Sequence, residues 1–596
     1  MARATKPLDA GTGRLCASFD VTTAGWLSLG APHLGHGFVE AVAGPPFDER
    51  LRGDADATRR HRLAMTLGDH PFVSVEIDGE RPTLDADPSD PGRPRWSGPG
   101  LSVEVEAEDE AAVIRQRWVT RSGSRPTVRI LVGGRVDRPA LAEITELVPP
   151  TATGAGTSVA IDHGHARLAA DALPAAATVA VRGCEVRWQI VELGAVGTLT
   201  WPAGEGPAGF TIDATIEPLP PAPRPAGRRR AGDPTDRLTD RGLAYVRGCT
   251  ALRLGEDERV ILTDHRILPL SWTRDAYWQA LALLAADGPG DRMRVADHLR
   301  WLWRRCERPD GRWVRSHHAN GLRKDPAFQA DQQLYPVVEL ADYWRLTGTL
   351  PDGIDWSAAV TGAWAAALEE VDPTTGLIAT DENAADDPSP APFIGSTQIL
   401  LWYAARRLVQ VATDAGLSID IAAVRSAAAH VRRGFGAFRT GGGPWPYAID
   451  GHGSRVAYHD ANDLPIVLAP LWGFCDAADE DWRATMAFAF SAGNPGWVPG
   501  SRSGLGSAHT RGAWTLGDVQ RWTLARIAGD ASGGEAALAR LDEVRFEDGM
   551  LPEAYGGDGD DAIRHWFAWP GAALAALRVL DRRGLLRDRL SVRDTG

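Results

Sequence analysis

The sequence predicts an α+β protein of two domains, an N-terminal antiparallel β-sandwich followed by a helical toroid. Its 596 residues exceed what a single hydrophobic core usually supports. The first part of the chain alternates apolar and polar residues, whereas the second repeats apolar residues every three or four positions. Residues 217–235, rich in Pro and Arg, separate the two patterns. We therefore expect a sandwich at 1–216, a linker at 217–235 and a helical domain at 236–596.

Short alternating runs predict the strands of the first domain. They cover residues 101–106, 113–119 and 128–132, and clusters of Gly, Pro and Asp lie between them. Such spacing is typical of a large antiparallel sandwich. This part of the sequence contains no paired carboxylates, no metal-ligand spacing and no glycine-rich phosphate loop. We expect it to support or shape a site.

Helical periodicity predicts the second domain. It is clearest at residues 275–286, 337–346, 394–411 and 516–527, and strand patterns are few. About 350 residues allow roughly a dozen helices of average length. Long Gly/Pro/Asp loops divide the helices, and one of them spans 491–518. Loops of this kind between regular elements often carry function.

Composition limits the class of partner. The formal charge of -14 argues against nucleic acid, and no apolar run is long enough to span a membrane. Five scattered cysteines without CxxC spacing argue against a disulfide framework or a thiolate zinc site. We expect neither metal nor cofactor. No secretory signal is visible, so we expect a cytoplasmic protein; the oligomeric state is unspecified. The 22 Trp residues fit either a large helical core or a carbohydrate-binding cleft.

The segment 550–569 carries the strongest indication of chemistry. It places Glu553 before a Gly/Asp-rich loop, and Trp566 and Trp569 follow. A carboxylate beside indole rings suits cleavage of a sugar, since the acid acts on water or the glycosidic oxygen and the rings pack on the pyranose. A surface turn followed by a helix with core aromatics is the alternative.

Four other clusters contain candidate sugar-binding groups. Trp272, Arg274 and Asp275 precede a predicted helix, where an Arg-Asp pair could bind hydroxyls or Asp275 could cap the helix. Asp331 is either a helix cap or a substrate contact. The acidic loop at 381–387 crowds carboxylates that could raise one another's pKa, as a general acid requires, or could simply be solvated. The remaining candidates are Asp460, Asn462, His509 and Thr510.

Together these motifs resemble glycoside hydrolase family 125, the metal-independent exo-α-1,6-mannosidases. The resemblance is carried, in order, by Trp272-Thr-Arg-Asp275, residues 331–336, residues 459–465, the loop from Asn494 to Thr510, and Glu553-Ala-Tyr with Trp566-Phe-Ala-Trp569. It implies an (α/α)6 barrel and an inverting, metal-free mechanism with Glu553 as general base. The sandwich before a barrel resembles bacterial family 15 glucoamylases.

The sequence does not decide which residue of the acidic loop is the general acid. The family has Arg-Pro-Ser-Asp-Asp where this chain has Ala-Thr-Asp-Glu-Asn. Matching Thr-Asp-Glu to Ser-Asp-Asp nominates Asp381 or Glu382, whereas alignment on Ile394-Gly-Ser-Thr nominates Asp386.

The resulting hypothesis is an inverting exo-α-glycosidase acting on a carbohydrate. A 1,6-linked α-mannoside is the first expectation for its substrate and an α-glucoside the second. A glycoside phosphorylase and a non-catalytic sugar-binding protein are the alternatives of other classes.

Overall fold

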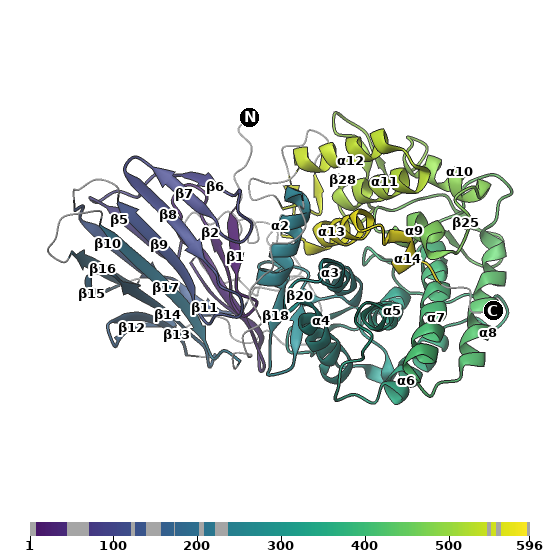
Figure 1. The fold of residues 1–596 in the computed structure, drawn as a ribbon, viewed down its shortest axis with the longest axis horizontal. Coiled ribbons are helices and arrows are strands. Elements are labelled where there is room, and N and C mark those ends of the chain that lie inside the picture. The colour runs from purple at the N-terminus through teal and green to yellow at the C-terminus, as the bar shows by residue number, and fades with distance from the viewer. Residues whose placement is uncertain are drawn as a thin grey trace.

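The computed structural model divides the chain into a β region, residues 7–220, and a helical region, residues 236–592, which lie side by side (Figure 1). The structure describes residues 7–43, 71–120, 125–138, 157–171, 173–192, 194–201, 208–220, 236–544, 550–555, 562–564 and 566–592. Most of the predicted linker, residues 221–235, lies outside this described part. The predicted domain limits therefore stay predictions.

Two antiparallel sheets build the β region. One has the order β1-β2-β3-β5-β10-β16-β15, with β4 between β3 and β11; the other has the order β12-β13-β14-β17-β9-β8-β7-β6. The first contains β1 (Leu8–Gly11), β2 (Cys16–Phe19), β3 (Trp26–His33), β4 (Gly37–Val42), β5 (Val73–Ile77), β10 (Val128–Gly133), β11 (Arg135–Asp137), β15 (Glu185–Val191) and β16 (Gly194–Thr200). The second contains β6 (Asp85–Asp87), β7 (Arg95–Gly98), β8 (Leu101–Glu106), β9 (Ile114–Thr120), β12 (Thr157–Asp162), β13 (His165–Ala170), β14 (Ala176–Arg182) and β17 (Gly209–Glu217).

Alternation along the strands places one face of each sheet in a shared core. In β8 and β9 every second side chain is buried, and Val103 lies opposite Trp118 on the buried face. Apolar residues from both sheets form one hydrophobic cluster. The strands predicted at 101–106, 113–119 and 128–132 are confirmed, because period-two burial is visible in sequence whenever one face of a strand is polar.

The helical region contains the predicted series of helices. These are α2 (Arg237–Tyr245), α3 (Thr273–Ala286), α4 (Asp291–Arg300), α5 (Ala330–Thr347), α6 (Trp356–Leu368), α7 (Gly395–Ala415), α8 (Ile421–Gly434), α9 (Leu464–Trp472), α10 (Glu480–Ala489), α11 (Thr515–Ala528), α12 (Ala531–Val544), α13 (Ala568–Arg582) and α14 (Leu586–Leu590). All four helices predicted from periodicity are present, as α3, α5, α7 and α11. None of the described helices is both long and apolar enough to cross a membrane.

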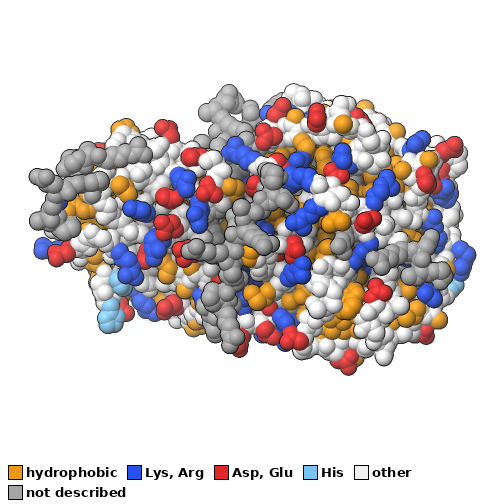
Figure 2. Space-filling model, in the orientation of Figure 1, with side chains coloured by type: hydrophobic (Ala, Val, Ile, Leu, Met, Phe, Trp, Pro, Cys, Tyr) orange, Lys and Arg blue, Asp and Glu red, His pale blue; other side chains and the backbone are white. Residues whose placement is uncertain are grey.

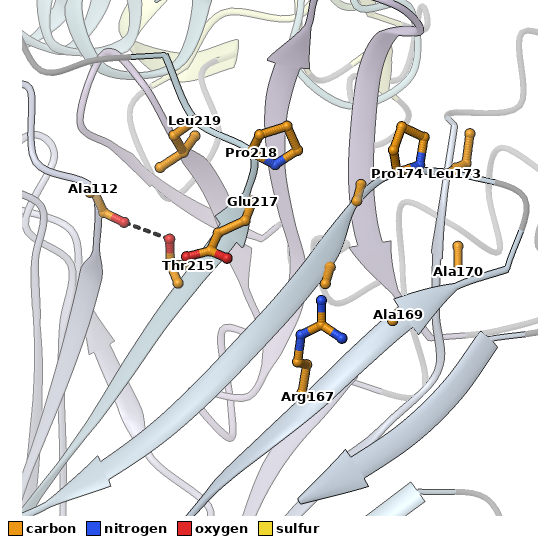
Figure 3. Close-up of a pocket in the computed structure, with 12 residues that line it drawn as sticks. Ala112, Arg167, Ala169, Ala170, Leu173, Pro174, Thr215, Glu217, Pro218 and Leu219 are labelled. Carbon is orange, nitrogen blue, oxygen red and sulfur yellow. Dashed lines mark hydrogen bonds between the residues drawn. The ribbon is translucent and has the colours of Figure 1, made fainter. Parts of the chain in front are cut away.

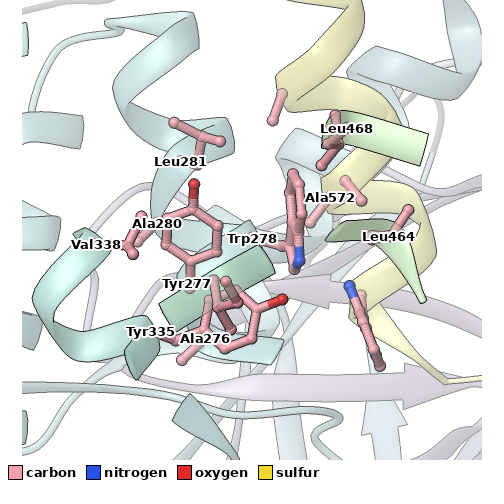
Figure 4. Packing of buried hydrophobic residues seen from close by; sticks show 14 of the residues in the cluster. Ala276, Tyr277, Trp278, Ala280, Leu281, Tyr335, Val338, Leu464, Leu468 and Ala572 are labelled. Carbon is pink, nitrogen blue, oxygen red and sulfur yellow. The ribbon is translucent and has the colours of Figure 1, made fainter. Parts of the chain in front are cut away.

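Alternate helices pack against one another in sequence. Helix α3 contacts α5, and the contacts continue through α7, α9, α11 and α13, which contacts α3 again. These six helices are buried on nearly all sides, whereas α8, which packs on α7, buries only a stripe. In Figure 4, Tyr277 and Trp278 of α3 lie among side chains from α5, α9 and α13. The centre of the helical region is therefore a core of aromatic and aliphatic side chains.

Helix α5 begins earlier than its apolar periodicity indicates. It starts at Ala330 with Gln329 as N-cap, so Asp331 lies inside the first turn and the capping role considered for it is wrong. Pro336 has no N–H to donate to the Gln332 carbonyl four residues earlier. That carbonyl instead accepts from the Thr273 hydroxyl of α3 at 2.8 Å. The proline thus leaves a backbone acceptor that joins the starts of two adjacent helices.

Short strands occupy the long connections, which the sequence predicts as loops. They form five small antiparallel sheets: β18 (Ala251–Arg253) with β19 (Arg259–Ile261); β20 (Leu270–Ser271), β21 (Ser316–His318) and β22 (Arg323–Asp325); β23 (Phe393–Ile394), β24 (Ala448–Ile449) and β25 (Arg455–Val456); β26 (Trp497–Val498) with β27 (Gly504–Leu505); and β28 (Ala513–Trp514), β29 (Ala554–Tyr555) and β30 (Ala562–Ile563). Strands of two or three residues are too short to show a period. Three of them, β20, β23 and β28, lead directly into or toward α3, α7 and α11.

The β region and the helical region are joined by backbone contact and by buried charges. Gly11 of β1 and Gly248 lie so close that a Cβ on either would clash with the other backbone. Glu110 accepts from Arg253 at 3.0 Å and pairs with Arg259, both buried in the helical region. Away from this junction, basic and acidic side chains are interspersed over the face in Figure 2.

Candidate active site

Hydrogen bonds connect several starts of the six mutually packed helices to one another or to a neighbouring loop. Between α3 and α5, Arg274 donates to Asp331 at 3.1 Å; between α7 and the α9 cap, Ser396 donates to Asp463 at 2.6 Å. The Thr515 N–H of α11 donates to the carbonyl of Glu553, at 3.2 Å. Helix N-termini carry partial positive charge. Several helix N-termini at one end of the helical region therefore stabilise the negative charge of the carboxylates that lie there.

One buried guanidinium is surrounded by three carboxylates. Arg274 lies 3.1 Å from Asp331, 3.4 Å from Asp386 and 3.4 Å from Asp275, and its guanidinium stacks 5.0 Å above the Trp569 ring. Burial raises the pKa of Asp275 to about 6, although Arg274 acts in the opposite direction. Burial also raises the pKa of Asp331. Since one cation cannot neutralise three carboxylates, this cluster favours retention of a proton.

Glu553 is held on both of its carboxylate oxygens. Its side chain is 3 % exposed; Oε1 accepts from the Thr510 hydroxyl at 3.1 Å, and Oε2 lies 3.0 Å from Arg564 Nε. The Glu553 N–H donates to the Arg564 carbonyl at 3.1 Å, so the two residues face each other across a short hairpin. Arg564 has a φ of 50°. This arrangement fixes the direction of the carboxylate.

The acidic loop contains carboxylates in four different environments. Asp381 is exposed. Both oxygens of Glu382 accept from Arg315, at 3.0 and 3.1 Å, and burial raises its pKa. Asp386, with a φ of 65°, accepts from Gln329 at 2.7 Å and from Arg274 through the same oxygen, Oδ1. Asp387 pairs with His509.

The adjacent residues His509 and Thr510 connect the acidic loop to Glu553. Its Nδ1 lies 3.2 Å from Asp387 Oδ1. Burial lowers the pKa of His509, but the hydrogen bond to Asp387 and the charges of Glu553 and Asp386 outweigh it and raise the pKa above its ordinary value. Thr510, the next residue, donates to Glu553. The acidic loop and Glu553 therefore lie at the same end of the helical region.

Asp460 and Asn462 form a buried polar network beside this end. Asp460 accepts from Tyr458 at 2.6 Å and from the Asn462 side chain at 2.8 Å. Burial and the charge of Asp460 raise the pKa of the neighbouring Asp463 to about 8, so this pair binds a proton at neutral pH. Asp460 thus has protein partners that account for its position, and Asp463 joins the network although the sequence did not single it out.

Two predicted tryptophans lie at the site, and a third lies elsewhere. Trp272 and Trp569 are buried, and neither indole N–H has a hydrogen-bond partner among the residues described here; the same is true of Asn462 Oδ1. Buried polar groups are nearly always paired, so we expect these three atoms to bond ligand or water. Trp566 instead donates its indole N–H to Asp9 of the β region at 2.9 Å. The structure thus gives Trp566 an inter-region contact where the sequence predicted contact with sugar.

Sequence reasoning missed three residues that hold the predicted ones. Arg315 pairs with Glu382, Gln329 bridges Glu382 and Asp386, and Arg564 pairs with Glu553. Arg315 lies two residues before the adjacent histidines His317 and His318, and nothing near Gln329 distinguishes it in the sequence. Within the part of the chain that the structure describes, no three His, Cys, Asp or Glu side chains are grouped to hold a metal ion.

A cavity of about 660 Å³ lies in the β region, away from these residues (Figure 3). It is bounded by strands β13, β14 and β17, with Arg167 and Glu217 among mostly small side chains. None of the predicted site residues lines it. The chemistry-bearing residues gather at the helix starts, so we place the candidate active site there.

Comparison with known proteins identifies the chemistry. Residues 361–578 match the family model of the metal-independent alpha-mannosidases (GH125). The chain is a glycoside hydrolase. The matched segment of the hydrolase contains the acidic loop, His509 and Glu553, and begins after Arg274 and Asp331. No curated protein matches the hydrolase.

The fold of the hydrolase is shared with a solved structure. A bacterial glucoamylase complexed with acarbose aligns with a TM-score of 0.62 at 9% identity, covering 99% of this chain and 95% of the glucoamylase. The order of a β region followed by a helical region is thus shared over the whole length. A metal-independent alpha mannosidase of Streptococcus pneumoniae, in a non-productive complex with alpha-1,6-mannobiose, aligns with a TM-score of 0.49 at 18% identity, covering 58% of this chain and 93% of that one.

Proposed function

We propose that the hydrolase is an inverting, metal-independent, exo-acting α-glycosidase that releases a terminal sugar. A 1,6-linked α-mannoside is the first substrate class to test, because the family model is that of alpha-mannosidases, and an α-glucoside is the second. We further propose that α3, α5, α7, α9, α11 and α13 are the inner helices of an (α/α)6 barrel and that residues 1–216 form a separate sandwich.

The observation that carries the proposal is the orientation of Glu553 relative to the acidic loop. Thr510 and Arg564 hold its carboxylate from two sides, and His509, which precedes Thr510 in the chain, pairs with Asp387 of the acidic loop. An inverting glycosidase needs a carboxylate that deprotonates water and a second, about 6.5–9.5 Å away, that protonates the leaving oxygen. Glu553 is suited to the first task, since its fixed oxygens would aim at a single water molecule.

Asp386 is the best candidate for the general acid. Both hydrogen bonds formed by its side chain among the described residues go to Oδ1, and that side chain is 21% exposed, so Oδ2 could carry a proton to the glycosidic oxygen. Glu382 uses both oxygens as acceptors for Arg315 and would lose one of these bonds on protonation. The surplus of carboxylates around Arg274 favours a proton on one of them.

The groups around Arg274 are suited to bind the terminal sugar. Asp275 and Asp331 could accept from hydroxyls, and Arg274, whose guanidinium stacks on the Trp569 ring, could donate to them. Trp272 adds a donor and Asn462 an acceptor that have no hydrogen-bond partner in the described part of the chain. In this proposal, residues at the helix starts bind the terminal sugar, and residues of the loops act as acid and base.

The test is hydrolysis of aryl α-mannoside and aryl α-glucoside by wild type, Glu553→Gln and Glu535→Gln, an exposed glutamate on α12 that serves as the matched control. Proton NMR follows the anomer released first. We expect the β-anomer from one substrate, no effect of EDTA, a loss of about 10²–10⁴-fold in Glu553→Gln and no loss in Glu535→Gln. Initial release of the α-anomer, or full activity of Glu553→Gln, contradicts the proposal.

A further inference from the structure

The β region contacts the hairpin that carries Glu553 through a buried network centred on Asp9. Asp9 lies in β1 opposite Ser18 of β2. Leu8 and Ala10 point into the sandwich core, so Asp9 points to the other face. Figure 1 shows β1 and β2 on the side of the β region that faces α2. A carboxylate is thus placed, fully buried, at the contact between the two regions.

Each oxygen of Asp9 accepts a hydrogen bond from a different partner. Oδ1 accepts from the Ser18 hydroxyl at 2.7 Å, and Oδ2 accepts from the Trp566 indole N–H at 2.9 Å. Ser18 also lies 3.1 Å from His265, whose other ring nitrogen lies 2.8 Å from the Tyr245 hydroxyl. Hydrogen bonds to a buried carboxylate are strong, and neither the indole N–H nor the carboxylate could be left unpaired without cost.

A second carboxylate of the β region holds the same indole ring indirectly. Glu40 of β4 pairs with Arg266, and the Arg266 guanidinium lies 5.7 Å from the Trp566 ring. The His265 ring meets Trp566 edge-on at 5.8 Å. Trp566 is therefore fixed in position and in rotation by residues of the loop 263–268 and of the β region.

Trp566 lies two residues after Arg564, which pairs with Glu553. Arg564 contacts Glu553 through both its backbone carbonyl and its side chain. Because Trp566 is only two positions from Arg564, a shift of Trp566 would disturb both contacts of Arg564 with Glu553. The sugar-binding groups on α3 and α5 are held by their own bonds, Arg274 to Asp331 and Thr273 to Gln332, which do not pass through Trp566.

We propose that Asp9 is a positioning residue for the general base: through the indole N–H of Trp566 it holds the hairpin on which Arg564 orients Glu553. The inference rests on the proposed function of Glu553. It gives the β region an indirect part in catalysis, exerted through the hairpin that carries the base.

The experiment compares Asp9→Asn and Trp566→Phe in the full chain with Glu110→Gln as control. The amide introduced by Asp9→Asn keeps one acceptor oxygen, but it turns an N–H toward the second of the two donors, Ser18 and Trp566. The phenyl ring introduced by Trp566→Phe keeps most of the packing but has no hydrogen-bond donor. Glu110 also joins the two regions, but it does so through Arg253 and Arg259. All variants are first shown to be folded by circular dichroism, and their Tm values are measured.

We expect kcat of Asp9→Asn and of Trp566→Phe to fall about 10- to 100-fold with KM within about twofold, because the base is misplaced while the sugar pocket is kept. The double variant should lose little more than either single one. Glu110→Gln should lower Tm without lowering kcat. If Asp9→Asn does not fold, Trp566→Phe alone carries the test.

The inference is overturned if Asp9→Asn and Trp566→Phe keep wild-type kcat, if their losses add in full, or if Glu110→Gln loses as much kcat for an equal loss of Tm. Glu553→Gln separates this inference from the proposed function. An inactive Glu553→Gln with a fully active Asp9→Asn refutes the positioning role alone, whereas an active Glu553→Gln removes the base itself.

Discussion

Replacement of Asp386 by Asn tests which carboxylate of the acidic loop donates the proton. The amide oxygen of the Asp386→Asn variant would still accept from Gln329 and Arg274, so the loop should keep its conformation. At Oδ2 an amide group replaces a carboxyl that could release a proton, and the variant cannot carry a negative charge beside Arg274. Glu382→Gln is the matched comparison, because its amide keeps one of the two acceptors for Arg315.

The size of the effect depends on how much help the leaving group needs. General acid catalysis contributes about 10²–10⁴-fold, or roughly 3–5 kcal/mol of the activation free energy. Without a proton from the acid, a sugar leaving group would depart as an unstable alkoxide, so it needs the whole of this contribution. A dinitrophenyl leaving group departs as a stabilised anion and needs little of it. We therefore expect Asp386→Asn to lose about 10²–10⁴-fold on a disaccharide and less than about 10-fold on the dinitrophenyl glycoside.

The assay is kcat/KM for both substrates in wild type and both variants. A selective loss on the disaccharide in Asp386→Asn identifies Asp386 as the acid. The same selective loss in Glu382→Gln would transfer the role to Glu382, and equal losses on both substrates would show that Asp386 acts only in binding or folding. Either of the last two outcomes refutes the argument from the accessible Oδ2.

Three further predictions concern groups that support the site. Thr510→Val removes a hydrogen bond to the Glu553 carboxylate and should lower kcat/KM about 10- to 100-fold, the equivalent of roughly 1.5–3 kcal/mol, with little change in Tm. Arg274→Met leaves Asp331 and its neighbours without their cation and should cost about 3–5 kcal/mol of unfolding free energy in urea titrations; an unchanged midpoint would contradict this. The pKa of Asp463, about 8 when folded, exceeds its ordinary value of about 4, so the stability from its protonated form is present at low pH and lost as pH rises through 8. The unfolding free energy should fall by up to about 1.4 kcal/mol per pH unit between pH 5 and 8, and Asp463→Asn should remove that slope.

The arrangement of elements could be predicted where burial is periodic. Strands β8 and β9 alternate because each has one face on the hydrophobic core shared by the two sheets. Helices α3 and α7 were found from their apolar repeats, although both are buried on most sides. The two-residue strands β26 and β28 were not found, because their pairing depends on partners distant in the chain and leaves no local repeat.

The candidate site could be predicted residue by residue but not as a set of contacts. Motif order selected Arg274, Asp331 and Glu553, and the structure brings their elements to one end of the helical region. The residues that orient them, Gln329 and Arg564, are ordinary in sequence. Their importance comes from distances of 2.7 to 3.1 Å to carboxylates on other loops, which no local pattern encodes.

Trp566 shows the limit of reading function from residue type. In sequence Trp566 and Trp569 are equivalent indoles after a carboxylate, and both suit stacking on sugar. They differ only in what reaches them: the guanidinium of Arg274 lies over Trp569, whereas the carboxylate of Asp9, some 557 positions away, accepts from Trp566. An indole whose N–H is bound to a buried carboxylate cannot also offer that N–H to a hydroxyl. The residue that each indole contacts, and not the aromatic ring itself, therefore decides its role. Trp569 can face substrate, whereas Trp566 holds the hairpin that carries the proposed base, Glu553.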